Sequence, residues 1–246
     1  MNIIGVIYLI ILAYFIFGGV AFYFINRRAS RNAARNRRIK YITYCIIIHI
    51  IFFSIVFNSV IFRYLAVVIC VMGLYELYTL FSHSNYSFKQ FFYLSLIIYL
   101  IFSAGFLLFG GLDKELILFS FLVVAIFDSF SQIIGQLWGK IKIMPSVSPG
   151  KTLEGLTGGT VIAILSSILF KGLLDIPTQN VILTAAGIVM FAFIGDSSAS
   201  FYKRKYNVKD FNNLIPGHGG FLDRFDSFIA GGAWIAFCEY LLKINL

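Results

Sequence analysis

The sequence has few charged residues: Asp, Glu, Lys and Arg make up only 13% of its 246 residues, whereas 59% are hydrophobic. An ordinary soluble domain carries about 25% charged residues, and its core cannot absorb this much apolar sequence. The scarcity of charge excludes a soluble globular protein and indicates an integral membrane protein. Acidic residues are the scarcer kind, 11 against 20 basic ones, and the basic residues lie between hydrophobic runs. That placement favours contact with anionic lipid headgroups and argues against nucleic-acid binding.

Three other features are missing. Cys45, Cys70 and Cys238 lie in apolar runs without C-x-x-C spacing, so they predict neither a redox site nor a zinc site. A cleavable signal peptide is not expected, because the apolar run at residues 2–25 is too long for one and is followed by basic residues. There is no convincing internal repeat of the kind that transporters show.

Apolar stretches near 20 residues predict an all-α fold, a polytopic membrane bundle with about eight transmembrane helices. The expected spans are roughly 3–25, 41–57, 60–80, 91–109, 116–137, 160–174, 181–202 and 223–242. The break at Asn58-Ser59 is weak, so the second and third spans could instead form one tilted or re-entrant unit. We divide the chain into N-terminal transmembrane helices with a basic cytoplasmic loop, residues 1–90, and a C-terminal catalytic domain, residues 91–246.

Connecting loops that are rich in basic residues alternate along the chain with loops that contain few. On the side that is poor in basic residues, the loops hold mainly Lys114 and Lys243. The positive-inside rule therefore predicts that the side rich in basic residues, which also carries every polar motif, faces the cytoplasm across the cell membrane. Both termini would be external. The richer side holds Arg27, Arg28, Arg31, Arg35, Arg37, Arg38 and Lys40, then Lys89, then Lys140, Lys142 and Lys151, and then Lys203, Arg204, Lys205 and Lys209.

The longest polar stretch, residues 200–226, lies between two apolar runs. It combines basic side chains for anionic groups, carboxylates for cations, and a glycine-rich turn. Basic groups and paired carboxylates beside a membrane indicate phosphate and divalent-metal chemistry on a lipid. The residues concerned are Lys203, Arg204, Lys205, Lys209, Asp210, Asp223, Asp226 and, in the turn, His218.

Two helical faces would present these groups. Asp196, Ser200 and Lys203 are spaced i, i+4 and i+7, which places a carboxylate within the span and a cation nearer the cytoplasm. Asp223 and Asp226 share a face in the first turn of the last span. The helix dipole alone could favour a single aspartate there. Three carboxylates that bracket one cationic loop favour metal binding instead.

A second polar segment begins in the fifth span, where Asp128 shares a helical face with Gln132 and Gly135. An ionisable residue inside a span is costly and therefore indicates function, although a hydrogen bond to a neighbouring helix is the structural alternative.

The same segment continues through residues 146–155. Ser148, Lys151 and Thr152 supply phosphate donors, and Glu154 could orient a base or a metal-bound water. The run Gly-Lys-Thr at 150–152 is not a P-loop, because Pro145 stands where that motif needs glycine and no strand is expected before it.

Both segments resemble the phosphatidate cytidylyltransferases, the CDP-diacylglycerol synthases. The match covers roughly residues 128–155 and 194–228, and its spacing holds throughout. Three positions depart from the family pattern: Gly150 stands where lysine is common, Tyr202 replaces an aliphatic residue, and Asn212 replaces a small one. The matching positions are Ser200, Lys203, Arg204, Lys209, Asp210, residues 216–220 (PGHGG), Asp223, Arg224 and Asp226, together with the Ser-Pro-x-Lys-Thr-x-Glu-Gly element at 148–155.

The resemblance implies transfer of a cytidylyl group from CTP to phosphatidate, which yields CDP-diacylglycerol and pyrophosphate. It implies Mg²⁺ as cofactor, leaves a second cation open, and implies a homodimer. A CTP-dependent polyprenol or lipid kinase, or a cytidylyltransferase for another lipid phosphate, is the alternative; an ion-coupled transporter is a more distant one. The predicted catalytic residues are Asp196, Lys203, Arg204, His218, Asp223 and Arg224; the substrate-binding residues are Asp128, Ser148, Lys151, Thr152, Glu154, Ser200 and Lys209; and the metal ligands are Asp196, Asp223 and Asp226.

Overall fold

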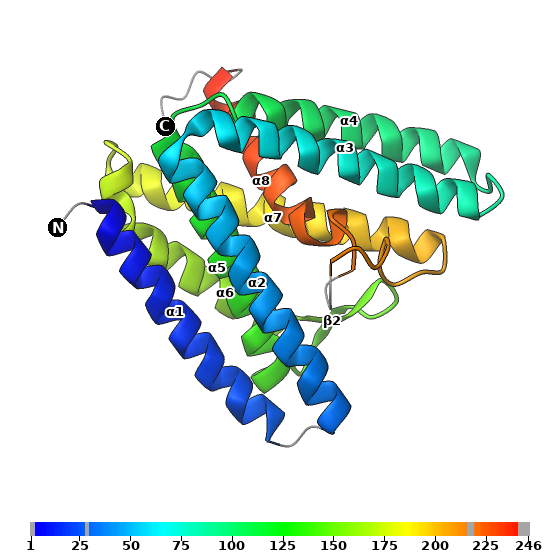
Figure 1. Ribbon diagram of the computed structural model, residues 1–246, viewed down its shortest axis with the longest axis horizontal. Helices are drawn as coiled ribbons and strands as arrows, with labels where there is room; N and C mark the ends of the chain where they lie inside the picture. Colours follow the sequence, from blue (N-terminus) through cyan, green and yellow to red (C-terminus); the bar gives the residue numbers. More distant parts are fainter. Residues whose placement is uncertain (1–2, 28–29, 216–218, 241–246) are drawn as a thin grey trace.

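The computed structural model describes residues 3–27, 30–215 and 219–240. Within these residues the chain forms eight α-helices, a short β-hairpin and one 3-10 turn (Figure 1). Each predicted span overlaps a helix, so the helical membrane bundle is confirmed. Arg28, His218 and Lys243, which entered the sequence predictions, lie outside the described residues.

Six of the helices are long and apolar enough to cross a membrane. They are α1 (Ile3–Asn26), α2 (Arg31–Phe57), α3 (Ser59–His83), α4 (Lys89–Phe109), α5 (Lys114–Trp138) and α7 (Thr178–Lys205). The other two are α6 (Leu153–Leu169), which has 17 residues, and α8 (Leu222–Tyr240), whose first turns carry three charged side chains. Strands β1 (Lys142–Met144) and β2 (Ser148–Thr152) pair antiparallel, and the 3-10 turn covers Lys171–Leu173.

Helix α8 lies at the centre of the bundle, and most of its residues are buried. The ring of Phe228 has its centroid 6.0 Å from that of Phe62 on α3, 5.1 Å from Phe106 on α4 and 5.6 Å from Phe121 on α5. Such edge-to-face and tilted ring pairs favour one arrangement of the helices, which matters in lipid because association there depends on close packing. The aromatic cluster therefore fixes α8 against three spanning helices.

Helices α7 and α8 cross closely at Gly195. A Cβ atom at this position would lie 2.5 Å from the carbonyl oxygen of Asp226 and 2.6 Å from the Cβ of Ala230. Only glycine allows the two backbones to approach this far, as small residues do at other membrane helix interfaces. The crossing places Asp196, the next residue on α7, beside the first turns of α8.

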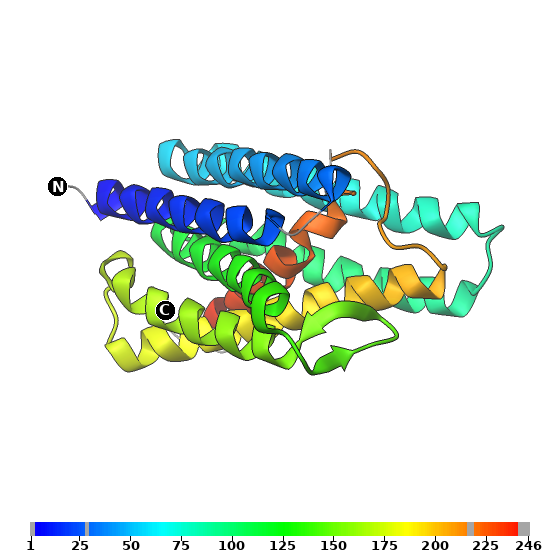
Figure 2. The same cartoon turned by 90° about the horizontal axis from the view of Figure 1, so that it is seen from below.

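Successive helices run back and forth, so their connections gather at two ends of the molecule. Residues 58, 110–113 and 170–177 lie toward the upper left of Figure 1. The first turn of α2, the 84–88 turn, the β-hairpin and the stretch after α7 lie toward the bottom and the right of Figure 1, where the helices spread apart (see also Figure 2). The two polar segments follow α5 and α7, and their described residues beyond these helices lie at this second end.

Candidate active site

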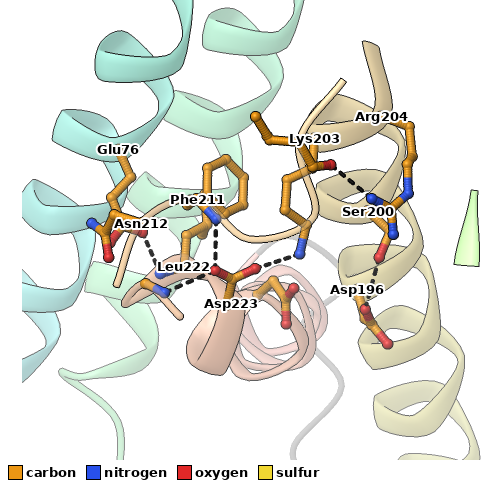
Figure 3. A network of polar contacts seen from close by, with 12 residues as sticks. Glu76, Asp196, Ser200, Lys203, Arg204, Phe211, Asn212, Leu222 and Asp223 are labelled. Atoms are coloured by element: carbon orange, nitrogen blue, oxygen red, sulfur yellow. Dashed lines mark hydrogen bonds and ion pairs between the residues drawn. The ribbon is translucent and has the colours of Figure 1, made fainter. Parts of the chain in front are cut away.

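One face of α7 carries the predicted carboxylate, Asp196, and the predicted cation, Lys203. The hydroxyl of Ser200 donates to Oδ1 of Asp196 at 3.3 Å, as their i, i+4 spacing predicts. One turn further along, Lys203 forms an ion pair with Asp223 of α8 (Figure 3). The last turns of α7 therefore present a carboxylate and an ammonium group side by side toward α8.

The β-hairpin reaches the same face through Lys151. Its ammonium group lies 3.0 Å from Oδ2 of Asp196 and donates to the hydroxyl of Ser197 at 2.9 Å. The same nitrogen lies 5.0 Å from the centroid of the Phe193 ring, in a cation–π contact. The structure thus joins the two polar segments, which are far apart in the sequence, into one site.

Asp223 is buried, with 2% of its side chain exposed. Besides the ion pair with Lys203, its Oδ2 accepts hydrogen bonds from the backbone N–H groups of Phe211 and Gly220, both at 2.8 Å. These bonds hold the stretch after α7 against the start of α8. Gly219 is required here, because it has a φ of +85° and a Cβ would lie 2.7 Å from Oδ2 of Asp223.

Further carboxylates lie where α5, α7 and α8 meet. The hydroxyl of Ser227 donates to Oδ1 of Asp128 at 3.3 Å, and its backbone N–H donates to Oδ1 of Asp226 at 2.7 Å. Asp128 and Asp226 also lie within electrostatic range of Asp196. The hydrogen bond to α8 is the structural alternative considered for Asp128, and the structure places that residue next to the other carboxylates as well.

Thr152 and Glu154 have roles in the local fold. The hydroxyl of Thr152, which is buried, caps α6 by accepting from the N–H of Gly155 at 3.1 Å. Glu154 is half-buried and accepts from the backbone N–H groups of Lys140 and Ile141 at 2.9 and 3.2 Å, which closes the hairpin onto α6. These hydrogen bonds, that of Lys140 first, hold the pKa of the Glu154 carboxyl below its usual range. Direct substrate contact by these two residues stays a prediction.

Arg204 also donates hydrogen bonds to two other segments of the chain. Its Nε donates to the carbonyl of Val147 at 2.9 Å and its Nη1 to the carbonyl of Val208 at 2.7 Å. It therefore ties the hairpin to the stretch that follows α7. By contrast, the Nε of Arg224 is buried without a hydrogen-bond partner among the described residues, and Lys209 is exposed.

A metal ion would have to use few protein ligands. Within the described residues, no group of three or more His, Cys, Asp or Glu side chains is arranged to hold a metal. Mg²⁺ commonly takes only one or two carboxylates and completes its shell with phosphate oxygens and water. A carboxylate has about four lone-pair positions; two donors contact Asp196 and three contact Asp223. Both residues keep an acceptor position, so the donor set fits a magnesium ion.

Glu76 is part of the site, although the sequence alone does not assign it a role. It lies on α3 with 1% of its surface exposed, and accepts from the backbone N–H groups of Phe221 and Leu222 at 2.8 and 2.7 Å (Figure 3). It also accepts from the amide of Asn212 at 2.5 Å. A carboxylate at the N-terminus of α8 satisfies free N–H groups and suits the helix dipole. The signal in the sequence was an ionisable residue inside an apolar span.

The positions that depart from the family pattern contact α3. The hydroxyl of Tyr202 donates to the carbonyl of Leu77 at 2.8 Å, one residue after Glu76, and Asn212 donates to Glu76 itself. Gly150 has no atoms within 4 Å of the place its Cβ would take. Two of the three departures therefore belong to the contact between α3 and the site.

Two cavities lie away from these residues. One, of about 560 Å³, lies between α3 and α4 and is lined by apolar and aromatic side chains with Lys89. The other, of about 270 Å³, lies at the opposite end, beside Lys114 and Leu173. Neither contains a predicted site residue.

Comparison with known proteins follows the same segments. The sequence model of the cytidylyltransferase family matches residues 91–242. A Staphylococcus epidermidis protein named phosphatidate cytidylyltransferase is 39% identical over 158 residues, 62% of this chain and 60% of the relative. Proteins of the same name from Bacillus subtilis (44% over 104 residues, 42% and 39%) and Staphylococcus aureus (35% over 158 residues, 62% and 60%) are also similar. The chain thus covers three fifths or less of the length of these relatives.

Proposed function

The chain belongs to the cytidylyltransferase family, and from that premise we propose that it transfers a cytidylyl group from CTP to phosphatidate. The products would be CDP-diacylglycerol and pyrophosphate. The observation that supports this most directly is the pair of ion pairs on α7, Lys151 with Asp196 and Lys203 with Asp223. They place cations for phosphate groups next to carboxylates for a metal at one end of a membrane bundle.

In the proposed reaction an oxygen of the phosphatidate phosphate attacks the α-phosphorus of CTP. A new P–O bond forms, the bond between the α- and β-phosphates breaks, and pyrophosphate leaves with the electron pair. The attacking oxygen is already anionic, so no strong base is needed. The main obstacle is repulsion between two anionic phosphates, and catalysis therefore depends on alignment and charge neutralisation.

The side chains of this chain can supply both effects. The ammonium groups of Lys151 and Lys203 would donate to phosphate oxygens, and their low exposure strengthens such contacts. Ser200 and Ser197 line the same face of α7 and can donate as well. Arg204 would hold the hairpin in position through its bonds to backbone carbonyls.

We propose Mg²⁺ as the cofactor, held by Asp196 and Asp223; Asp226, the third predicted ligand, is not grouped with these two in an arrangement that could hold a metal. When bound, the ion would neutralise charge on the transferring phosphate groups. Asp223 would keep its hydrogen bonds to the backbone of Phe211 and Gly220, so the stretch after α7 stays in place around the phosphates. A role for His218 in triphosphate contact or proton handling stays a prediction.

The site would face the cytoplasm of a cell membrane. The positive-inside rule supports this orientation, because the end that carries the site is the end rich in Lys and Arg. CTP would then arrive from the cytosol and the lipid headgroup from the bilayer. The homodimer implied by the family resemblance stays a prediction.

Product analysis tests the proposal. The protein, purified in detergent, is given CTP and Mg²⁺ with either phosphatidate or a polyprenol, and the products are identified by mass spectrometry. We expect CDP-diacylglycerol and pyrophosphate in equal amounts. CDP together with a phosphorylated polyprenol would establish the lipid-kinase alternative. No nucleotide turnover with any lipid would reject the proposal and make ion flux the next measurement.

A further inference from the structure

Helix α2 lies outside the segment that the family model matches, yet one of its faces borders the candidate active site. The hydroxyl of Tyr44 donates to the carbonyl of Ala125 on α5 at 3.1 Å and accepts from the hydroxyl of Ser129 at 3.0 Å. Ser129 is the residue after Asp128. These bonds fix α2 against α5 at the level of that carboxylate, and Lys40, one helical turn earlier, lies on the same face as Tyr44.

Lys40 belongs to a group of positive charges from three elements. Its ammonium group lies within electrostatic range of Lys209, which follows α7, and of Arg224, on the first turn of α8. Asp210 is the carboxylate in range of Lys40. Lys40 and Lys209 are exposed, whereas the Nε of Arg224 is buried without a partner. Among the described residues, the ion pairs do not include any of these three cations.

Arg224 lies among charges of both signs. It is within electrostatic range of Asp128 and Asp226 and also of Lys40. Like charges held together repel each other, and an anion between them removes that repulsion. The three cations are therefore suited to an anionic group that contacts the exposed Lys40 and Lys209 and the buried Nε of Arg224.

We propose that Lys40, Lys209 and Arg224 form a phosphate-binding site, in which α2 supplies a cation that the 91–242 segment lacks. The proposal rests on the proposed function, since the phosphate would belong to the triphosphate of CTP or to the headgroup of phosphatidate. Lys40 then has a role beyond orienting α2 in the membrane. Because Tyr44, one turn after Lys40, contacts Ser129, the bound phosphate would lie on the side of the bundle that carries Asp128.

Two substitutions at position 40 and one control test this site. Lys40→Gln removes the charge, and Lys40→Arg keeps it. Arg38→Gln is the matched control, because Arg38 is an exposed cation on the same helix but two residues away, on a different face. KM for CTP and KM for phosphatidate are measured separately, together with kcat.

We expect Lys40→Gln to raise one KM about tenfold, the usual effect of losing one charged hydrogen bond, with kcat within about twofold. Lys40→Arg and Arg38→Gln should stay near wild type. The substrate whose KM rises identifies the source of the phosphate. Unchanged KM values for both substrates in folded Lys40→Gln would overturn the proposal, because a charge that only orients the helix affects neither value.

A binding measurement separates this proposal from the proposed function. Stabilisation by inorganic pyrophosphate is measured as a rise in melting temperature and needs no turnover. A rise that is smaller in Lys40→Gln than in wild type and Arg38→Gln supports the phosphate site even if no CTP is consumed. Equal rises in all variants would overturn it. If Lys40→Gln does not fold, Lys209→Gln, which alters an exposed residue of the same group, replaces it in both measurements.

Discussion

Glu76 connects a membrane-spanning helix to the candidate site through a single side chain. Both of its oxygens accept backbone N–H groups at the start of α8, and one also accepts from Asn212. The N–H groups at the start of a helix have no partner within the helix, and leaving them unsatisfied inside the bundle is costly. Glu76 therefore stabilises the turn that leads to Asp223.

Replacing Glu76 by Gln should destabilise the protein. The amide keeps one acceptor oxygen but presents N–H groups where the other oxygen accepted from Leu222, and the charge is lost. We expect a loss of about 1–3 kcal/mol in the free energy of unfolding. Thermal unfolding in detergent measures it. Glu115→Gln is the control, since 46% of that side chain is exposed; equal melting temperatures for the two variants would contradict the assigned role.

At the scale of single residues, the sequence predicted which charged side chains belong to the site but not which residues they contact. The i, i+4 contact of Asp196 with Ser200 followed directly from helical spacing. Lys151 with Asp196 and Glu76 with Leu222 depend on helix packing, which spacing along the chain does not contain. Asn212 and Tyr202 are understood only together with α3, because their partners are Glu76 and Leu77.

Among the elements, the crossing of α7 and α8 decides the geometry of the site. Asp196 follows Gly195, and the Cβ that alanine would add at 195 lies 2.5 Å from the backbone of Asp226. The two helices would have to separate, and the carboxylates with them. Gly195→Ala should therefore lower both stability, by about 1–3 kcal/mol, and turnover.

Gly150→Ala is the matched comparison, because no atom lies within 4 Å of its Cβ position. We expect it to unfold at the wild-type temperature. Unfolding curves and pyrophosphate release of both variants are measured in the same detergent. Gly195→Ala that matches Gly150→Ala in both respects would show that the close crossing is not required.

Element boundaries depart from the predictions where apolar content and helix formation differ. Helix α2 begins at Arg31 instead of 41, since its basic first turns form helix but are not apolar. Helix α6 begins at Leu153 instead of 160, where Thr152 provides the cap. The β-hairpin was not predicted, because its strands contain Pro149 and Gly150 and depend on distant partners such as Arg204.

The molecule as a whole carries its polar connections at one end. Because α4 starts at that end, and the 170–177 connection lies at the other, the proposed orientation makes a direct prediction. In a variant without the native cysteines, Asp175→Cys should react with a membrane-impermeant maleimide in intact cells. Gln90→Cys should react only after the membrane is opened; both positions are exposed. The reverse pattern would place the site outside the cell.

The fold class followed from composition, because so apolar a chain has few alternatives to a helical bundle. The sequence also placed eight helices, six of which are long and apolar enough to span. It did not show that α8 would be central, since its charged first turns resemble those of a surface helix. Packing of Phe228 against α3, α4 and α5 explains why it is buried.

The central claim is that Asp196 belongs to a site that transfers a cytidylyl group to a lipid phosphate. The direct measurement is pyrophosphate release from CTP by the purified protein, with phosphatidate and Mg²⁺ each present or omitted, in wild type, Asp196→Asn and Asp175→Asn. Asp175 is an exposed aspartate at the other end of the molecule. We predict release that needs all three components, falls about a hundredfold or more in Asp196→Asn, and is unchanged in Asp175→Asn. Full turnover in folded Asp196→Asn would contradict the account.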